Sequence, residues 1–371
     1  MSIIKSLRIS APGKIILCGE HAVVYGKKAL ACSINLRTNA YLQKLTDSNE
    51  NSFKIKFKNL NDKVINLNEQ EIFKVKSQFS NEKNVENIIC TLKGERSDDQ
   101  LNAILLLILL LGEKISFEHI SNYVLEIETE LPIGAGLGSS ASLSSCLVTV
   151  FLILTKTIQP NRDLNFTREH LDLVNEYTFN IEKLFHGRPS GIDNSIVLNG
   201  NYIVFKNGQV HEKFKSNINL NILIINSNLP KQTREQVAKV KKLKENFSII
   251  GDSLINTIDL IADQFMICLK KDGYDERDDQ ILSNLIRMNQ GLLYSLDISN
   301  HKLNEIVNIS NKYNFSCKIT GAGGGGCLFA LISDDENFKS YLNELNNIED
   351  ISHFKSILGC EGIRVENISY L

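Results

Sequence analysis

The sequence predicts an α+β protein of two domains, residues 1–218 and 219–371. Its 371 residues exceed the usual size of one domain and are enough for two hydrophobic cores. Residues 125–131 alternate apolar and acidic side chains, the period of a half-buried strand, and an apolar helix follows after a glycine-rich loop. A new strand at 222–226 precedes several helical segments, so we place the second domain there. The last strand could return to the first domain.

The composition narrows the class of protein. There are 41 Lys and Arg against 43 Asp and Glu, a formal net charge of -2, so no basic field for nucleic acid or anionic membrane is expected. The run at 103–111, AILLLILLL, is shorter than the roughly 20 residues that span a bilayer, which predicts a buried core helix.

The cysteines and the two ends of the chain bear on location. The eight cysteines form no CxxC pair and are expected to be reduced, mostly buried thiols. The first residues lack the apolar segment of a secretory signal, and the final Ser369-Tyr370-Leu371 lacks the basic residue of a peroxisomal signal. We expect a cytoplasmic protein.

The first half should begin with short strands and tight turns. Residues 47–100 are rich in Asn, Lys and Glu with one alternating strand at 53–57, which suggests a mobile or variable insertion without chemistry. Thr167 is the expected N-cap of a helix that ends at Gly187. The other strands of this half are expected at 6–10, 14–18, 30–36 and 196–205.

The second half is expected to begin with one strand and to continue mainly with helices. After the strand at 222–226, apolar periodicity predicts helices, then a glycine run, a strand, a polar helix and a terminal strand. The helices are expected at 233–247, 252–271, 279–296 and 302–313, and the late strands at 328–332 and 363–369.

The segment LPIGAGLGSSASLSS, residues 131–145, joins a strand to a helix through a glycine loop. Gly134, Gly136 and Gly138 allow positive φ and close approach of a ligand, and the helix start offers free N–H groups to an anion. The GxGxG spacing differs from the dinucleotide-binding GxGxxG, and the GxxxxGK[ST] motif is absent from the sequence. A phosphate chain is the expected ligand, and a plain turn before a core helix is the alternative.

Three further segments carry polar residues in unusual places. In PGKIILCGEHAVVYG, residues 12–26, Lys14 opens an apolar strand, while Glu20 and His21 lie in the turn after it. Any of these could be an ordinary surface residue. Glu182 lies near a helix C-terminus, where the dipole disfavours an anion and a compensating cation is expected. Asp193 follows Gly191 in a tight turn, where capping is the alternative role.

The segment KITGAGGGGCLF, residues 318–329, places a glycine run between two strands. Ordering four consecutive glycines costs much backbone entropy, so a ligand or another backbone should come very close. Thr233 is explained locally as the N-cap of the next helix.

Four segments, PGKIILCGEHAVVYG, ELPIGAGLGSSAS, HGRPSGIDN and KITGAGGGGC, together resemble the superfamily of galactose, homoserine, mevalonate and phosphomevalonate kinases in order and spacing. Within it, GEHAVVYG and HGRPSGIDN are similar to the mevalonate kinases. The resemblance covers roughly residues 6–327 and implies a ribosomal-protein-S5-like first domain, a ferredoxin-like second domain, and an active site in the cleft between them.

The resemblance also implies roles for individual residues. Asp193 would be the base facing the substrate hydroxyl, with Lys14 near that oxygen and the γ-phosphate, and Ser140 with Glu182 would hold Mg²⁺. ATP-binding positions would be Lys14, Asn59, Thr129, Gly134, Ala135, Gly136, Leu137, Gly138, Ser139 and Ser140. Substrate-binding positions would be Glu20, His21, Asp193, Thr233 and Gly323.

Two positions depart from the family pattern. Ala141-Ser142-Leu143 stands where animal enzymes tend to have Ala-Ala-Tyr, which affects fine nucleotide contacts. Lys231 stands where Arg is frequent, which keeps the charge but loses a bidentate fork.

The implied activity is Mg²⁺-dependent transfer of the ATP γ-phosphoryl group to the C5 hydroxyl of mevalonate. A homodimer and feedback inhibition by prenyl diphosphates are implied as well. A kinase of phosphomevalonate or another alcohol, and a non-catalytic sensor on the same fold, are the alternatives.

Overall fold

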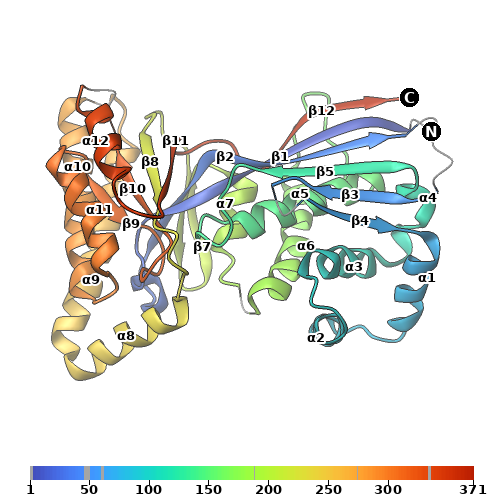
Figure 1. Ribbon diagram of the computed structural model, residues 1–371, viewed down its shortest axis with the longest axis horizontal. Coiled ribbons are helices and arrows are strands. Elements are labelled where there is room, and N and C mark those ends of the chain that lie inside the picture. Colours follow the sequence, from blue (N-terminus) through green and yellow to red (C-terminus); the bar gives the residue numbers. More distant parts are fainter. Residues whose placement is uncertain (1–2, 46–50, 60–61, 188, 274, 333–335) are drawn as a thin grey trace.

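The computed structural model describes residues 3–45, 51–59, 62–187, 189–273, 275–332 and 336–371. Within them, the chain forms an eight-stranded and a four-stranded sheet, which lie toward opposite ends of an elongated molecule (Figure 1). Strands β1 (Ile4–Cys18) and β2 (Ala29–Lys44) are the longest and run from the large sheet toward the small one. This hairpin therefore connects the two halves.

The large sheet has the strand order β12-β1-β2-β5-β3-β4, and β6 pairs with β2 and β7. Its pairs are antiparallel except for the parallel pair of β3 and β5. The remaining strands are β3 (Phe53–Phe57), β4 (Lys63–Leu67), β5 (Tyr123–Thr129), β6 (Tyr202–Lys206), β7 (Gln209–Phe214) and β12 (Arg364–Tyr370). The C-terminal strand is thus part of the first sheet.

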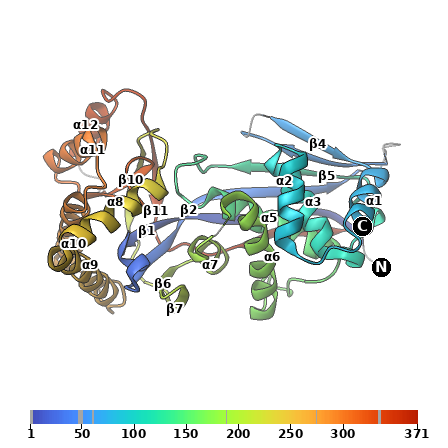
Figure 2. The ribbon, with the colours of Figure 1, turned by 90° about the horizontal axis from the view of Figure 1, so that it is seen from below.

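Helices lie along one face of this sheet, as the view from below shows (Figure 2). The 103–111 run forms most of α3, whose side chains are largely buried, which confirms the predicted core helix. The helices are α1 (Glu69–Gln78), α2 (Val85–Glu95), α3 (Asp99–Leu111), α4 (Phe117–Ile120), α5 (Ser139–Leu154), α6 (Arg168–His186) and α7 (Ile192–Asn199), with short 3₁₀ turns at Ala22–Tyr25 and Gly112–Lys114.

The small sheet has the order β11-β8-β10-β9, with antiparallel pairs, and helices cover its outer side (Figure 1). Its strands are β8 (Asn221–Asn226), β9 (Cys317–Ile319), β10 (Cys327–Leu331) and β11 (Ser352–Ile357). The helices are α8 (Thr233–Asn246), α9 (Ser248–Leu269), α10 (Glu276–Ser295), α11 (His301–Lys312) and α12 (Asn337–Leu345). The sequence analysis did not predict β11, because apolar and polar residues do not alternate along it.

Two expectations about local structure are wrong. The strands expected at 6–10 and 14–18 are one strand, because an irregularity between Pro12 and Gly13 lets the pairing with β2 continue. Residues 192–199 form a helix instead of the start of a strand, after Gly191 takes a φ of 80°.

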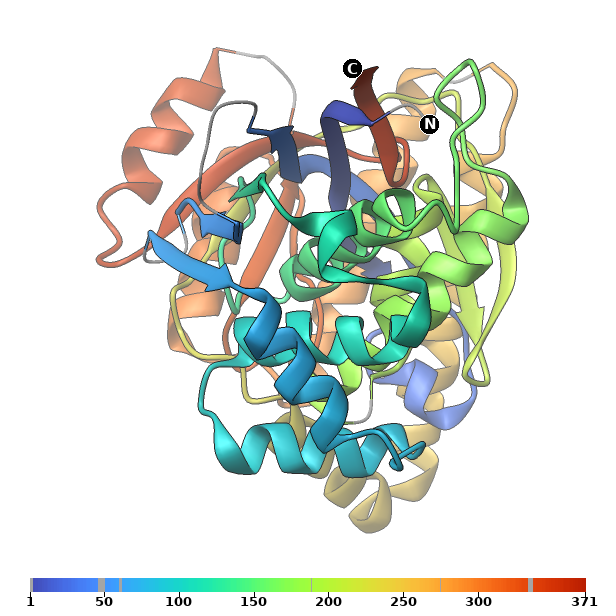
Figure 3. The same ribbon diagram turned by 90° about the vertical axis from the view of Figure 1, so that its right-hand side faces the viewer.

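Residues 47–100 hold more regular structure than the one strand expected. Besides the confirmed strand at 53–57, the segment contains β4, α1, α2 and the start of α3, seen from the end of the molecule in Figure 3. Asn68, Asn84 and Asp98 accept N-capping hydrogen bonds at the three helices, so polar residues begin helices here. Residues 46–50 and 60–61 lie outside the described part.

The boundary between the two hydrophobic cores does not coincide with the predicted boundary between the two domains. The predicted division after residue 218 falls between β7 and β8, yet the core of the second half includes Ile15, Leu17, Cys32 and Ile34 from β1 and β2. The far end of the first hairpin is thereby held against the second sheet. The exact boundary stays a prediction.

The expectations about the cysteines and about membrane-spanning helices can be compared with the structure. All eight cysteines are free thiols, and six of them are buried, as expected from their spacing. No helix in the described ranges has the length and apolar character needed to cross a bilayer.

Candidate active site

The glycine loop after β5 is held against the first strand. Lys14 N donates to Leu137 O at 2.8 Å, and a Cβ at Gly13 would lie 2.4 Å from the Leu131 side chain. Gly134, Gly136 and Gly138 have φ values of 72°, 86° and 75°, which favour glycine. The loop ends where the 16-residue helix α5 begins at Ser139, so free N–H groups of a long helix face the loop.

Lys14 and Asp193 form an ion pair beside this loop. Lys14 Nζ lies 2.9 Å from Asp193 Oδ1, with the Lys14 side chain 4% and that of Asp193 35% exposed. Lys14 comes from β1, while Asp193 stands in the first turn of α7. The structure therefore joins the two proposed catalytic residues, with the carboxylate partly open to solvent.

Ser140 and Glu182 also meet, across α5 and α6. Ser140 Oγ donates to Glu182 Oε2 at 3.0 Å, and Ser144 Oγ donates to Oε1 at 3.2 Å. His186 Nε2 lies 3.0 Å from Ser140 Oγ. Burial, with a smaller contribution from the charge of Asp193, raises the pKa of Glu182 to about 7. Only 2% of the Glu182 side chain is exposed.

The chemistry of this pair fits a hard divalent cation. A hydroxyl and a carboxylate are the oxygen ligands that Mg²⁺ takes from proteins, and the rest of its shell is usually water and substrate phosphate. A buried carboxylate with a raised pKa also lacks a compensating positive charge. Among the described residues, no group of three His, Cys, Asp or Glu side chains suits a metal.

Lys231 is a second cation of the site, which sequence reasoning noted only as a departure from the family pattern. A Cβ at Gly136 would lie 3.2 Å from Lys231 Nζ, and one at Gly321 would lie 4.0 Å from Lys231 Cε. The side chain thus extends from the segment before α8 to the two glycine loops. Partial desolvation of the ammonium beside the glycine loops and repulsion by Lys14 lower the pKa of Lys231.

A cavity of about 320 Å³ adjoins the start of α5. Thr129, Ser139 and Ser140, three of the positions that the family resemblance assigns to ATP, are among its lining residues. The other lining residues are Thr38, Ser97, Asp99, Gln100, Ile133, Leu143 and Phe185. Asn59 is absent from this lining, and its Nδ2 donates to Thr129 O at 3.1 Å, so it supports the end of β5.

Glu20 does not line the cleft. Its carboxylate forms an ion pair with Lys318 in which both side chains are fully buried, and it accepts a 3.3 Å hydrogen bond from Asn289 Nδ2. The side chain of Glu20 is not exposed in this arrangement, and the substrate contact expected of it stays a prediction. His21 Nε2 contacts Ala322 O at 2.8 Å, so this turn is anchored to the second glycine loop.

The glycine run at 321–326 packs against other backbone. A Cβ at Gly323 would lie 2.4 Å from Ile298 O, and one at Gly325 would lie 2.7 Å from Leu229 O. Gly324 N donates to Ile298 O at 2.7 Å and Gly326 N to Leu229 O at 3.0 Å. Of the two readings left open, close backbone approach explains these glycines, and the substrate role of Gly323 has no support in this contact.

The two glycine loops nevertheless touch. A Cβ at Gly326 would lie 3.1 Å from Ala135 O.

Thr233 is the first residue of α8 and is exposed. The N-cap of this helix is Gln232, so the interpretation of Thr233 as the N-cap is wrong.

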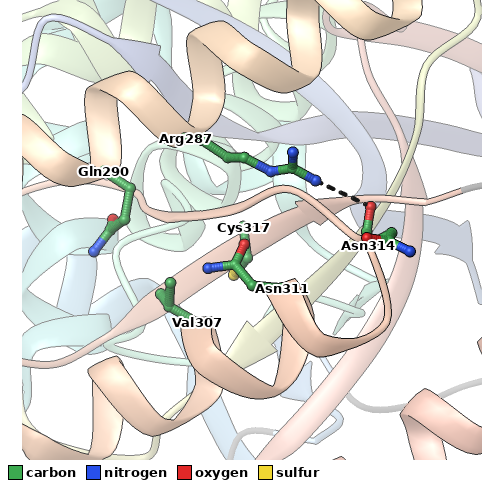
Figure 4. Close-up of a pocket in the computed structure, with 6 residues that line it drawn as sticks. All are labelled: Arg287, Gln290, Val307, Asn311, Asn314 and Cys317. Atoms are coloured by element: carbon green, nitrogen blue, oxygen red, sulfur yellow. Dashed lines mark hydrogen bonds between the residues drawn. The ribbon is translucent and has the colours of Figure 1, made fainter.

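A different hollow, of about 320 Å³, lies between α10 and α11 (Figure 4). Its lining is Arg287, Gln290, Val307, Asn311, Asn314 and Cys317. None of the residues expected in the active site is among them.

Comparisons with known proteins identify the family of the chain. Two family descriptions match: "GHMP kinases N terminal domain" over residues 102–201 and "GHMP kinases C terminal" over residues 269–348. The mevalonate kinase of Schizosaccharomyces pombe is 31% identical over 97% of this chain and 92% of its own. Human mevalonate kinase is 32% identical over 88% of this chain and 86% of its own.

A solved structure shows the same fold. The crystal structure of the Methanococcus jannaschii mevalonate kinase covers 98% of this chain and 99% of its own at 27% identity, with a TM-score of 0.72. The expected two-domain kinase fold is confirmed. The chain therefore belongs to the mevalonate kinase family, within the GHMP kinases.

Proposed function

We propose that this chain transfers the γ-phosphoryl group of ATP to the C5 hydroxyl of (R)-mevalonate, giving 5-phosphomevalonate for isoprenoid and sterol precursors. The observation that carries the proposal is the 2.9 Å pair of Lys14 and Asp193 beside the glycine loop. The names of the relatives supply the substrate, since they are mevalonate kinases.

Asp193 has the position of a general base. Its carboxylate is partly exposed and would accept a hydrogen bond from the substrate hydroxyl, then its proton as the bond to phosphorus forms. Lys14 holds this carboxylate in place and would neutralise charge on the transferring group. Phosphoryl transfer has a loose transition state in most analyses, so such positioning and charge neutralisation supply most of the rate.

The glycine loop and the adjoining cavity suit the nucleotide. Backbone N–H groups at 134–140 would surround the phosphates, as helix starts and glycine loops do for anions. Thr129 and Ser139 line the cavity beside them, and Asp99 and Gln100 would offer polar contacts to the nucleoside.

Mg²⁺ is the expected cofactor, with Ser140 and Glu182 as its protein ligands. When bound, the cation would neutralise charge on the β- and γ-phosphates. The 3.0 Å contact of the two side chains and the raised pKa of Glu182 support this assignment. Glu182→Gln should raise the Mg²⁺ concentration needed for half-maximal activity, and an unchanged requirement would exclude Glu182 as a ligand.

Two expectations rest on the family resemblance alone, a homodimer and inhibition by prenyl diphosphates, and both stay predictions. The cytoplasmic location expected from the cysteines and the missing targeting signals stays a prediction as well. The sensor alternative is disfavoured because Lys14, Ser140, Glu182 and Asp193 are all present and paired as a kinase needs.

An acceptor panel tests the proposed reaction. The protein is incubated with ATP and Mg²⁺ and, separately, with mevalonate, phosphomevalonate, galactose or homoserine, and ADP is followed by a coupled assay. ADP should form with mevalonate at a rate that Asp193→Asn lowers by about 10²- to 10⁴-fold. Preference for phosphomevalonate or another alcohol would overturn the substrate, and no acceptor-dependent ADP at all would overturn the activity.

A further inference from the structure

The outer edge of β1 is occupied by Thr320, a residue from the second half of the chain. In the described part of the chain, β12 pairs with β1 only from Ile4 to Ser10, so residues 14–18 have a neighbouring strand on the β2 side alone. Ile16 N donates to Thr320 Oγ1 at 2.9 Å, and Thr320 Oγ1 donates to Ile16 O at 3.1 Å. One hydroxyl thus satisfies both backbone groups that a further strand would pair with at this residue.

Lys14 uses the same edge of the strand. Lys14 N donates to Leu137 O of the first glycine loop at 2.8 Å, and Ile16 is the next residue whose N–H points the same way. The backbone that carries Lys14 is therefore held on this edge by the first glycine loop and, two residues later, by Thr320, which directly precedes the second glycine loop. Thr320 is 5% exposed, so little water competes for its hydroxyl.

Pairing with β2 alone holds this part of β1 only over a short stretch. The register between the two strands shifts just before Gly13 and again just after Ile16, so residues 13–16 pair continuously between two irregularities. Lys14 Nζ must nevertheless keep its 2.9 Å contact with Asp193. Misplacement of a reacting group by about 1 Å can cost about a hundredfold in rate, so a second anchor beside Lys14 has a consequence for catalysis.

We propose that Thr320 is a positioning residue for Lys14: its hydroxyl holds the strand at Ile16 and so sets where the Lys14 ammonium lies beside the first glycine loop. The inference rests on the proposed function, because Lys14 is taken there to act on the transferring group. Thr320 acts through hydrogen bonds to backbone and needs no contact with a substrate. The second half of the chain thereby helps to place a catalytic group of the first half.

A double-mutant cycle tests the inference. Thr320→Val nearly keeps the shape of the side chain but removes the hydroxyl, and it is made both in the parent and in Lys14→Met, which lacks the ammonium. The values of kcat and KM are measured on each full-length protein with mevalonate and with ATP that carries a radioactive γ-phosphate, so that slow variants can be followed. Thr320→Ser retains a hydroxyl and tests for rescue.

Ser310→Ala is the matched control, made in the same two backgrounds. Ser310 is a fully buried hydroxyl of α11, and it makes two hydrogen bonds, to Ile306 O at 2.8 Å and with Tyr341 Oη at 2.7 Å. Its removal therefore costs a comparable set of contacts without touching β1. Urea unfolding of every variant measures the loss of stability separately from the loss of rate.

Thr320→Val should lower kcat about tenfold in the parent with little change in KM, because a misplaced lysine affects the transition state more than substrate binding. In Lys14→Met the same change should lower kcat by less than about twofold, because no ammonium is left to position. Thr320→Ser should recover most of the rate. Ser310→Ala should change kcat little, and by the same factor in both backgrounds.

An equal fold loss from Thr320→Val in the two backgrounds would overturn the inference, because a merely structural defect multiplies with the loss of Lys14. A Thr320→Val enzyme as fast as the parent would overturn it too. If Thr320→Val does not fold, Thr320→Ala takes its place in the same cycle. A Lys14→Met enzyme that keeps the parent's kcat would instead overturn the role of Lys14 in the proposed function.

Discussion

Lys14 Nζ and Asp193 Oδ1 lie 2.9 Å apart, although one residue belongs to the first strand and the other to the seventh helix. The bulged strand carries Lys14 beneath the glycine loop, and Gly191 turns the chain so that α7 begins beside it. This contact defines where the acceptor hydroxyl should bind.

Asp193→Asn should reduce kcat by about 10²- to 10⁴-fold, because the amide cannot take the hydroxyl proton. Affinity for a non-hydrolysable ATP analogue should change little. Steady-state kinetics with mevalonate and a binding titration check both. Asp172→Asn, an exposed carboxylate of α6, serves as the control. A kcat near that of the parent would show that Asp193 is not the base.

The lowered pKa of Lys231 predicts that activity falls at alkaline pH. Its lowered pKa means that it loses its proton at a lower pH than an ordinary lysine, and the neutral amine cannot stabilise phosphate oxygens. Activity should therefore fall as the pH rises through that pKa. Lys231→Arg stays charged, so the fall should begin at higher pH, whereas Lys231→Met should be weak at every pH. Profiles of kcat/KM that coincide for the parent and Lys231→Arg would refute this role.

Gly138→Ala should impair catalysis more than Gly134→Ala. Both positions have positive φ, which costs an alanine about 1–2 kcal/mol. Only at Gly138 would the new Cβ press on Lys14, at 2.9 Å from its Cγ, whereas nothing lies within 4 Å at Gly134. We expect kcat to fall about a hundredfold in the first variant and far less in the second. Urea unfolding should show similar destabilisation in both, and equal kcat losses would contradict the role assigned to this contact.

Lys318→Met should destabilise the protein by about 3–5 kcal/mol, because Glu20 would be left buried without its partner. The double variant Glu20→Gln with Lys318→Met should recover most of that loss, measured by urea unfolding. Lys312→Met is the matched control, since its ion pair with Glu344 is solvent-exposed and should matter little. A Lys318→Met protein as stable as the parent would mean that Glu20 has another partner.

Local signals predicted much of the fold. The strand, glycine loop and helix from residue 123 to residue 154 were expected almost within their bounds, as was the Thr167 cap of α6. Both depend on neighbours in the chain: alternating apolar residues, positive φ at glycine, and a hydroxyl that accepts from a nearby N–H. The helix at 192–199 was missed because its short apolar run at 196–198 also suits a strand.

The same distinction between local and long-range information applies to the site residues. Lys14, Ser140, Glu182 and Asp193 were identified from their motifs, and the structure brings them together in two pairs. The buried ion pair of Glu20 was not predicted, because its motif says nothing of Lys318, which meets it from the second sheet. The sequence analysis assigned no role to His186 or Lys231, because their contacts are with residues from other elements.

By itself, the sequence determined the α+β class and the glycine loop between a strand and a helix, because spacing and backbone freedom are local properties. The residues of a phosphoryl-transfer site were implied by the resemblance of four motifs to the kinase family. Only the tertiary structure decided which charges are buried, which are paired and which face the cleft. It sets the pKa of Glu182 and Lys231, removes Glu20 from the surface and places the second glycine loop against backbone. Burial and electrostatic interaction depend on what surrounds a group in space, and those surroundings come from segments far apart in the chain.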